Sequence, residues 1–565
     1  MRLTRREKKC KLNILMKIID GKILDIDFEL FNAHPRINEN LAAATVRGLS
    51  KKTRLHHIYD ASLDKSMTRG AFLALCLALK DYIAKNFSEK RIGIILPSGI
   101  AGAAANIAVQ MAGKVSVNIN FTMGPEAARA YFRKSEVKTV ISSEKLRQKV
   151  SQKTPDFPWG ENFCDIAAIL KSIGKKGVAK KLIAVKLLPA WALIKLFKIP
   201  TAGGSKEASI IFTSGSEGEP KAAVLTHYNL MANCLQMYYT DIIPPSFALH
   251  ANLPLFHSFG QSIQVWFTSI FPHRVVAVAS PLEIKQNFDA MQKWKSNVMI
   301  STPTFLRSYY KKGDPAQAES LKIVIAGAEK TPDGFKEMWE KKFPNSAYKI
   351  GYGLTEASPV VCVNLPDMPA NKYRTYASGT RKDTVGQLFA GMQAKVVHPE
   401  TNEVLPIGEE GLLCLKGANI FGGYLNAPEL NAAKIKDGWL STGDIASLDE
   451  DGYIHIKGRV SRFSKIGGEM VPHALVEESI VAALGQGESE ELSVAISARE
   501  NEDKGEELVL ITTLEVDMQK LRKLMQEAGI SNLWIPKICV KVEKIPTLGS
   551  GKVSLGELKK IAENA

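Results

Sequence analysis

Short apolar runs alternate with helical patterns along most of the chain, an arrangement that is typical of α/β proteins. In chain order the pattern predicts a strand over 91–99, a helix over 103–113, strands over 115–121 and 208–215, and a helix over 226–239. Thr226 directly precedes this last helix and is its expected N-cap. The strand before it runs straight into a loop that contains glycines. The predicted fold class is therefore α/β.

The pattern changes in the second half of the chain. Residues 321–329 and 348–356 each predict an apolar strand followed by glycines and polar residues. After about residue 385 short strands alternate with turn residues, which predicts a β-rich subdomain. A smaller α+β unit is expected to follow. We therefore predict three parts: a basic N-terminal extension (1–50), a large N-terminal domain (51–461) and a small C-terminal domain (462–565).

The composition is that of an ordinary globular protein, with 45% hydrophobic and 23% charged residues among 565. No run of about 18 uncharged apolar residues occurs, so no transmembrane helix is expected. The seven cysteines are dispersed without a CxxC pair, which predicts reduced thiols in the cytoplasm and no metal site built from them. The basic N-terminus is interrupted at Lys17, which favours a solvated tail or a membrane-surface anchor over a signal peptide.

The net charge of +16 is compatible with nucleic acid, anionic lipid or an acidic protein partner. No zinc-finger spacing, RRM signature or basic zipper occurs, so nucleic-acid binding is not expected. Residues 175–200 are apolar and basic and lack acids. They predict either peripheral association with an anionic membrane or a surface helix pair packed on the protein, interrupted at Pro189.

The segment TSGSEGEPK (213–221) has the composition of a phosphate-binding loop. Gly215 and Gly218 permit a turn whose N–H groups surround an anion, and hydroxyls and a lysine accompany them. Alone, the segment is equally compatible with a plain loop. GSGK near the C-terminus imitates a Walker loop, but Pro546 stands at the first glycine position and Val553 replaces the hydroxyl residue.

Four later motifs follow in order: GYGLTE (351–356), STGD (441–444), GR (458–459) and GSGK (549–552). With TSGSEGEPK they make the chain resemble the AMP-forming, acyl-adenylating superfamily from about residue 55 to the end. LPLFHSFG (253–260), AGAEK (326–330), RFSKIGGEMV (462–471) and LGSGK (548–552) narrow the resemblance. They resemble the acyl-acyl carrier protein synthetase half of bacterial bifunctional 2-acylglycerophosphoethanolamine acyltransferase. The HxxxxD motif of the acyltransferase half is missing, which predicts a standalone synthetase.

The resemblance implies a role for each motif residue. The loop residues Thr213, Ser214, Gly215, Ser216, Glu217, Gly218 and Lys221 would surround the β- and γ-phosphates of ATP. Gly327, Ala328, Glu329 and Tyr352 would form the adenine pocket, Thr355 would meet the α-phosphate, and Asp444 and Arg459 would hold the ribose. Glu356 would bind Mg²⁺, a cation that prefers oxygen ligands, and Lys552 would bridge the carboxylate and the α-phosphate. Arg462 would be the hinge of a mobile C-terminal domain, and Lys465, Gly468 and Glu469 would line the thiol tunnel.

Three residues qualify the resemblance. Glu217 replaces the usual Thr or Ser, and a carboxylate about 4 Å from a phosphate would cost about 4 kcal/mol at an effective dielectric constant of 20. We therefore expect Glu217 to face a lysine, an arginine or Mg²⁺. Arg462 stands where many relatives have Asp or Lys. His257 replaces the Asp of amino-acid-activating relatives, and with Phe256, Phe259 and Trp266 nearby it predicts an apolar acyl tunnel, unless it is a core histidine.

The expected function is ATP-dependent activation of a long-chain fatty acid through acyl-AMP, followed by transfer to the phosphopantetheine thiol of acyl carrier protein. Coenzyme A presents the same thiol, so a fatty acid–CoA ligase is the alternative. An acidic carrier protein would be attracted by the net charge of +16. An adenylating enzyme for an aromatic acid and an inactive acyl-binding scaffold are further possibilities. Glu356 and Lys552 are both present, which argues against the scaffold.

Overall fold

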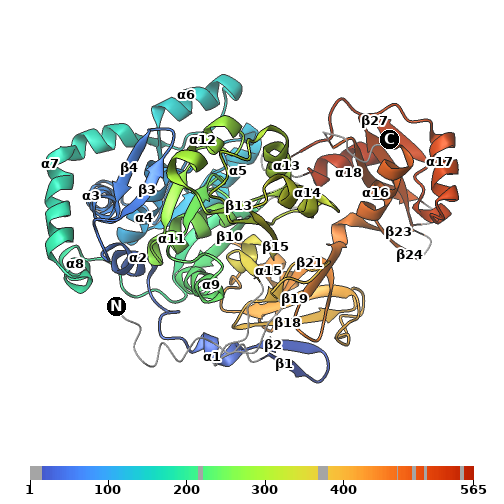
Figure 1. The fold of residues 1–565 in the computed structure, drawn as a ribbon, viewed down its shortest axis with the longest axis horizontal. Helices are drawn as coiled ribbons and strands as arrows, with labels where there is room; N and C mark the ends of the chain where they lie inside the picture. Colours follow the sequence, from blue (N-terminus) through green and yellow to red (C-terminus); the bar gives the residue numbers. More distant parts are fainter. Residues whose placement is uncertain are drawn as a thin grey trace.

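The computed structural model describes residues 16–213, 220–366, 379–466, 469–485, 492–501, 505–547 and 553–565. Most of them form a body of two α/β sheets and a third, β-rich sheet, and the last hundred residues form a smaller unit to one side (Figure 1). The predicted fold class, α/β with a large N-terminal and a small C-terminal part, is confirmed by this arrangement.

The first α/β sheet contains the two strands that flank the predicted phosphate loop. Among the described residues its order is β10 (Lys221–Thr226), β9 (Glu207–Thr213), β6 (Val115–Asn118), β5 (Arg91–Ile94), β7 (Thr139–Ser142), β8 (Asn162–Asp165). Its inner strands are parallel, while β10 runs antiparallel to β9. Strands β5, β6 and β9 lie where the sequence predicts them. Parallel strands are covered on both faces, which explains their nearly continuous apolar runs.

The second α/β sheet is larger. Its order is β17 (Gln387–Leu388), β16 (Val360–Val363), β15 (Ala347–Gly353), β14 (Ile323–Ala326), β13 (Val298–Ser301), β11 (Ala248–Ala251), β12 (Arg274–Ala277), β3 (His56–Asp60), β4 (Lys65–Thr68). The strands from β15 to β3 are parallel. The predicted strands that precede GAE and GLTE are β14 and β15. Both motifs therefore leave the carboxyl end of adjacent parallel strands, where α/β proteins place their ligands.

Buried helices lie against the two α/β sheets. Helix α4 (Ile100–Met111) is almost wholly buried and packs on α2 (Leu41–Leu49) and on the π-helix η1 (Ser262–Phe267). Helix α9 (His227–Thr240) begins with a capping box, because Thr226 and Asn229 bond each other's backbone N–H groups. Thr226 is thus the N-cap, as predicted.

The other helices are shorter or more exposed. Their bounds are α1 (Phe28–Asn32), α3 (Arg69–Asn86), α5 (Pro125–Ser135), α6 (Glu144–Lys153), α10 (Ser258–Gln261), α11 (Thr268–Ile270), α12 (Ile284–Trp294), α13 (Pro303–Lys312), α14 (Phe335–Lys342), η2 (Thr355–Ala357), α15 (Pro428–Lys434), η3 (Val460–Arg462) and η4 (Asn532–Trp534).

The third sheet corrects one sequence-based expectation. Its order is β1 (Met16–Ile19), β2 (Ile23–Ile26), β18 (Met392–Val397), β19 (Gly411–Gly417), β21 (Trp439–Leu448), β20 (Ile435–Lys436), with β22 (Ile454–Arg459) on β21. Residues 16–49 are therefore not an extension outside the large domain. Strand β2 pairs with β18, and α2 is buried in the core. The alternating apolar residues Leu24 and Ile26 provide the physical reason, since both are fully buried.

The C-terminal unit is an antiparallel sheet with one parallel edge. Its order is β24 (Glu469–Pro472), β23 (Phe463–Ile466), β26 (Gly505–Thr512), β25 (Val494–Asn501), with β27 (Ile538–Lys541) on β26. Helices α16 (His473–Ala483), α17 (Met518–Glu527) and α18 (Leu555–Glu563) complete it. It has its own apolar cluster, centred on residues such as Val471, Ile480 and Leu510.

The basic apolar segment forms two helices, α7 (Ile166–Leu187) and α8 (Ala190–Leu196). The break falls at Pro189, as predicted, and Gly174 adds a kink with a φ of 68°. Helix α7 packs along α3 and α8 packs on α2. No helix within the described ranges has the length and apolar character needed to span a membrane.

Candidate active site

Tyr352 and Asp444 join two motifs that are far apart in sequence. The Tyr352 hydroxyl on β15 donates a hydrogen bond of 2.5 Å to Oδ2 of Asp444 on β21. Arg459 on β22 donates from Nε to Oδ1 of the same carboxylate at 2.9 Å. Strands β21 and β22 pair antiparallel with Asp444 directly opposite Arg459, so the sheet register sets this contact. The predicted adenine and ribose residues are therefore brought together.

The electrostatics of this cluster follow from burial. The Asp444 side chain is buried, whereas 57% of the Arg459 side chain is exposed. Burial and then the adjacent Asp444 carboxylate raise the pKa of Tyr352 well above its usual value, so the hydroxyl remains a donor. The charge of Asp444 also raises the pKa of Arg459. Each carboxylate oxygen has a second lone pair, so Asp444 can still accept hydrogen bonds from a ribose.

Glu356, the predicted Mg²⁺ ligand, is oriented by Tyr424. The Tyr424 hydroxyl donates to Glu356 Oε1 at 2.5 Å, and the backbone N–H of Phe421 donates to the carbonyl of Glu356 at 2.8 Å. Among the described residues, none donates a hydrogen bond to the second carboxylate oxygen, Glu356 Oε2. A carboxylate held at one oxygen and open at the other fits a hard cation that is shared with phosphate oxygens. The donor set is therefore compatible with Mg²⁺.

Thr355 lies between Glu356 and the loop of LPLFHSFG. Its Oγ1 is 3.2 Å from Oγ of Ser258, so the two hydroxyls form a hydrogen bond. The turn before it needs glycine, because a Cβ on Gly353 would approach the carbonyl oxygen of Pro359 to 2.3 Å. The spacing in GYGLTE thus places Tyr352, Thr355 and Glu356 on one tight strand-to-turn segment.

The GAE segment forms the neighbouring wall at the end of β14. Ala328 has a φ of 72°, a left-handed conformation that is uncommon for a residue with a side chain. Glu329 does not point freely to solvent: the Thr304 N–H and hydroxyl donate to its Oε2 at 3.2 and 2.6 Å. Within the described residues, Glu329 Oε1 and the buried hydroxyls of Ser301 and Thr302 have no hydrogen-bond partner. Buried polar atoms without partners are suited to a polar ligand such as a nucleotide base.

The ends of the predicted phosphate loop are fixed by strand pairing. Thr213 closes β9 and Lys221 opens β10, and the two residues are opposite each other in the antiparallel register. Ser214, Gly215, Ser216, Glu217 and Gly218 lie outside the described residues. The roles of these five, including the orientation of Glu217, stay predictions. Lys552 is also outside the described residues.

Arg462, the predicted hinge residue, is bound to its own C-terminal unit. Its guanidinium donates to the carbonyl of Ile496 at 3.2 Å and forms an ion pair with Glu477 on α16. Burial raises the pKa of Glu477, and the charge of Arg462 opposes this shift. The backbones of Lys465 and Glu469 lie on the paired strands β23 and β24, and Gly468 is outside the described residues.

His257 lies beside an aromatic cluster at the start of α10. Its ring is 4.8 Å from that of Phe256, which contacts Phe121 edge-on at 5.4 Å. Phe259 is partly buried, and a Cβ on Gly327 would lie 3.8 Å from it, so it borders the GAE wall. Trp266 is fully buried on η1, deeper in the core. The predicted acyl tunnel through this cluster stays a prediction.

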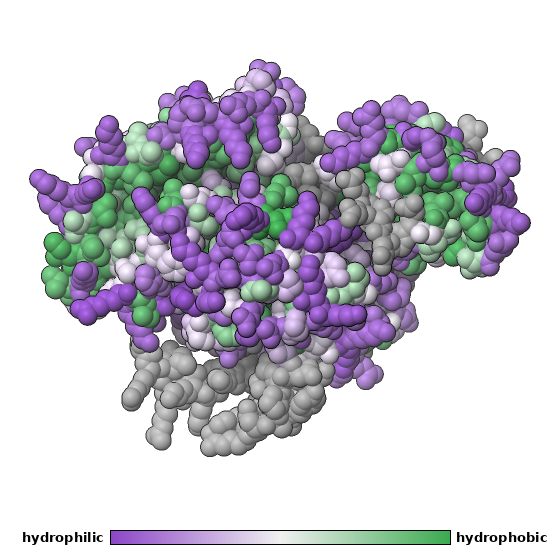
Figure 2. Space-filling model, turned by 45° about the horizontal axis from the view of Figure 1, so that its top comes forward, coloured by the Kyte–Doolittle hydropathy of each residue, from purple (hydrophilic) through white to green (hydrophobic). Residues whose placement is uncertain are grey.

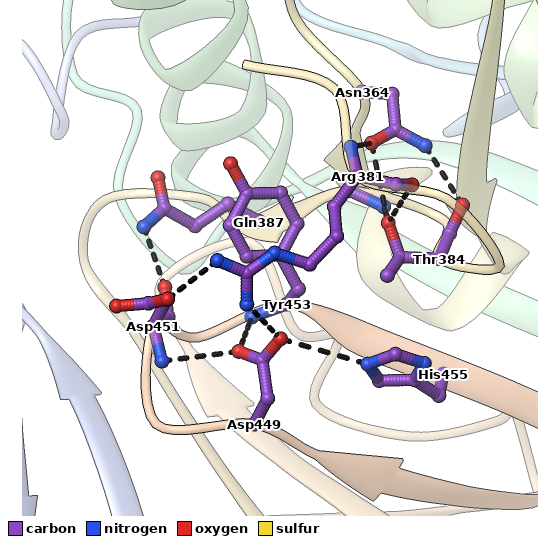
Figure 3. A network of polar contacts seen from close by, with 9 residues as sticks. Asn364, Arg381, Thr384, Gln387, Asp449, Asp451, Tyr453 and His455 are labelled. Carbon is purple, nitrogen blue, oxygen red and sulfur yellow. Dashed lines mark hydrogen bonds and ion pairs between the residues drawn. The ribbon is translucent and has the colours of Figure 1, made fainter. Parts of the chain in front are cut away.

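A polar network supports the far end of the β21–β22 hairpin that carries Asp444 and Arg459 (Figure 3). Arg381 forms ion pairs with Asp449 and, at 2.5 Å, with Asp451. Its guanidinium also lies 4.4 Å from the centre of the Tyr453 ring. Asp451, and secondarily Asp449, raise the pKa of Arg381. The hairpin is thus fixed at its turn as well as at the site.

Sequence reasoning missed three residues at the site: Tyr424, Ser258 and Lys330. Tyr424 lies in a turn-rich stretch without any motif pattern, so nothing local marks it. Ser258 lies inside LPLFHSFG, where the neighbouring His257 was the expected functional residue. Lys330 ends the AGAEK motif and forms an ion pair with Glu478 on α16, which connects the large body with the C-terminal unit.

A protein-family model matches the part of the chain that contains several of the site motifs described above. The model for "AMP-binding enzyme" matches residues 58–425, more than half of the chain. The chain belongs to the AMP-binding enzyme family. This match includes the loop at 213–221, GAE and GYGLTE, and it ends before STGD.

Curated relatives of this AMP-binding enzyme are identical to it at about a quarter of the aligned positions. A 4-coumarate–CoA ligase of Pinus taeda is 27% identical over 62% of the chain, and the match spans 64% of that relative, just under two thirds of its length. 4-coumarate–CoA ligase 2 of Oryza sativa subsp. japonica is 26% identical over 83% of the chain and 82% of its own length.

Solved structures show the same fold. ATP-bound MatB from Rhodopseudomonas palustris superposes with a TM-score of 0.74 over 92% of this chain and 98% of its own, at 21% identity. A fatty acyl CoA synthetase of Mycobacterium tuberculosis gives a TM-score of 0.67 over 94% of this chain and 99% of its own, at 20% identity. The chain therefore shares the fold of these two solved structures.

Proposed function

We propose that this AMP-binding enzyme is an AMP-forming acid–thiol ligase that activates a long-chain fatty acid and transfers it to the phosphopantetheine thiol of acyl carrier protein. In the first half-reaction a carboxylate oxygen attacks the α-phosphorus of ATP, and pyrophosphate leaves. In the second, the thiol attacks the acyl carbonyl of acyl-AMP and AMP leaves. A fatty acid–CoA ligase is the alternative.

The hydrogen bond between Tyr352 and Asp444 carries this proposal. It connects GYGLTE to STGD across 92 residues and so brings two of the motifs into direct contact. Arg459 from the GR motif completes the same contact, and Thr355 and Glu356 follow on the same strand end. Plain turn or cap roles would not require these residues to converge.

Each half-reaction develops negative charge, which fixed donors and cations stabilise. Lys221 and Arg459 supply positive charge, and the hydroxyl of Thr355 is a donor for the α-phosphate. Mg²⁺, when bound at Glu356, would offset charge on the phosphates. Lys552 would approach from the C-terminal unit, and Lys465, Gly468 and Glu469 would line the path of the thiol.

The identities of the thiol acceptor and of the acid substrate are supported by fewer observations. The motifs TSGSEG, AGAEK and RFSKIGGEMV resemble a synthetase that uses acyl carrier protein. The plant relatives are CoA ligases by name, which favours coenzyme A instead. His257 beside Phe256 provides no carboxylate for a substrate amine, so a fatty acid suits the site better than an amino acid.

In the test, the purified protein is incubated with ATP, Mg²⁺ and a C16 fatty acid, with holo-acyl carrier protein or coenzyme A in parallel reactions. The products are identified by mass spectrometry. Asp444→Asn is the inactive reference, and Asp437→Asn, an exposed residue in the same sheet region, is the matched control. Acyl carrier protein thioester with little acyl-CoA supports the proposal. Acyl-CoA as the main product replaces it with the alternative, and no acyl-AMP in either reaction contradicts both.

A further inference from the structure

Four large apolar side chains are exposed together on α7 and α8. The exposed fraction of the residue is 59% for Ile183, 76% for Leu187, 71% for Trp191 and 56% for Leu196. Figure 2 shows apolar side chains gathered at the edge of the molecule that these helices form in Figure 1, beside hydrophilic ones. An exposed apolar patch of this kind marks an interaction site more often than a scattered surface leucine does.

The same helices hold much of the protein's excess positive charge. Residues 166–196, which span both helices, contain seven lysines and no aspartate or glutamate, against a net charge of +16 for the whole chain. Lys176, Lys180, Ile183 and Leu187 follow each other at spacings of four, three and four residues. They therefore share one outward face of α7. Apolar and cationic groups thus occupy the same surface.

The patch is a fixed surface rather than a loosely packed segment. Val185, Leu193 and Ile194 on the inner faces of the two helices are buried in the main core. Lys181 forms an ion pair with Asp81 on α3 and lies over the ring of Phe197 at 4.3 Å. The inner faces are therefore satisfied by packing, and the outer apolar side chains remain exposed.

We propose that the outer face of α7 and α8 binds an anionic lipid surface. Leucine, isoleucine and tryptophan would enter the interfacial region, where tryptophan is favoured, and the lysines would meet anionic headgroups. The binding itself does not depend on the proposed catalytic function. If that function holds, the contact would give the enzyme access to fatty acids dissolved in a membrane.

Charge and position favour lipid over an acidic carrier protein as the occupant. The C-terminal unit, 462–565, holds 13 Lys and Arg against 17 Asp and Glu, so the excess positive charge lies elsewhere. Helices α7 and α8 lie at the end of the molecule opposite that unit (Figure 1). A carrier protein must deliver its thiol near the predicted tunnel residues, which are in the C-terminal unit.

The test is co-sedimentation of the full chain with vesicles of phosphatidylcholine alone or mixed with phosphatidylglycerol, at low and at physiological salt. We expect binding to the mixed vesicles that weakens as salt rises. Leu187→Gln with Trp191→Gln should abolish most of the binding. Lys180→Glu with Lys186→Glu should weaken it roughly tenfold or more, because each lysine contributes to attraction by anionic lipid.

Matched controls separate this surface from general charge and from misfolding. Lys145→Glu with Lys149→Glu changes the net charge equally on α6, and Leu282→Gln removes an exposed leucine outside this patch; both should bind as the unmodified protein does. Circular dichroism and melting temperature show that each variant folds. Equal binding to both vesicle types, or equal loss in the α6 control, overturns the proposal. A raised KM for holo-acyl carrier protein with unchanged vesicle binding in the Lys180/Lys186 variant also overturns it and assigns the face to a protein partner.

Discussion

Lys330 and Glu478 form an ion pair between the GAE segment of the large body and α16 of the C-terminal unit. Lys330 follows Glu329 directly, so the contact attaches the C-terminal unit beside the predicted adenine pocket. Both side chains are about half exposed, at 58% and 45%. An exposed pair contributes at most about 1 kcal/mol, which suits a contact that opens and closes.

Removing this ion pair should shift the balance between the two half-reactions. For Lys330→Ala and for Glu478→Ala we expect up to about a fivefold change in the ratio of ATP–pyrophosphate exchange to thioester formation, the equivalent of about 1 kcal/mol. The charge-swapped double variant, Lys330→Glu with Glu478→Lys, should return toward the original ratio. Lys336→Ala, a partly exposed lysine on α14, is the control. If the single variants and the control give the same ratio, the contact has no part in the domain arrangement.

Tyr352→Phe should destabilise the ligand-free protein more than the nucleotide complex. The substitution removes a hydrogen bond to the buried Asp444 carboxylate, which costs about 1.5–3 kcal/mol in unfolding free energy. Ribose hydroxyls can then replace the lost donor, so the rise in melting temperature on adding ATP should exceed that of the unmodified protein. A smaller rise would indicate that the Tyr352 hydroxyl contacts the nucleotide itself. Thermal shift with and without ATP measures both.

Tyr424→Phe should weaken the response to Mg²⁺. Without the phenol, Glu356 loses the donor that fixes its Oε1, and loss of such a supporting contact typically costs 10- to 100-fold in metal affinity or activity. The measurement is the Mg²⁺ concentration for half-maximal pyrophosphate exchange. Tyr228→Phe, a partly buried tyrosine on α9, is the matched control. An unchanged Mg²⁺ requirement in Tyr424→Phe would place the cation away from Glu356.

Arg381→Ala should lower stability modestly without changing the chemistry. The variant loses two ion pairs at the β21–β22 turn, one of them to the exposed Asp451. Because these groups are partly solvated, we expect a loss of about 1 kcal/mol in unfolding free energy, measured by urea titration. Pyrophosphate exchange at saturating ATP should stay within about twofold. A large loss of exchange at unchanged stability would mean that the hairpin turn controls the position of Asp444.

Buried histidines should make the protein sensitive to acid. Burial lowers the pKa of His57 to about 3, and those of His227 and His250 to about 4. In the unfolded chain a histidine has a pKa of about 6.5, so unfolding takes up protons below that pH. The stabilisation is complete above about pH 6.5 and is lost progressively toward pH 4, at up to about 1.4 kcal/mol per pH unit for each histidine.

A single variant tests this linkage. His250→Gln should reduce the slope of unfolding free energy against pH between 6.5 and 4 by about one proton, whatever its effect on stability at neutral pH. His56→Gln, which alters an exposed histidine, is the comparison variant. Equal slopes in the two variants would show that His250 is protonated in the folded protein.

Much of the fold was accessible from local pattern. Strands such as β9 and β14 are nearly continuous apolar runs. Such runs predict buried strands, because burial on both faces selects apolar residues. Thr226 was identified as an N-cap for the same local reason, since the cap depends on residues within one turn. The N-terminal boundary was wrong because β2 is a short strand whose partner, β18, lies more than 360 residues away. No local signal contains that pairing.

The sequence by itself determined the α/β class, the order of the motifs and the residue types available for nucleotide chemistry. Tertiary structure alone decided that Tyr352 bonds to Asp444, that Tyr424 orients Glu356 and that Lys330 reaches Glu478. These contacts join segments 92, 68 and 148 residues apart. Tertiary structure also decided which face of α7 and α8 is exposed. The order of leucines and lysines along the sequence does not indicate which side of each helix is buried. Local sequence sets backbone preference and chemistry, whereas partners far along the chain are chosen by strand register and packing.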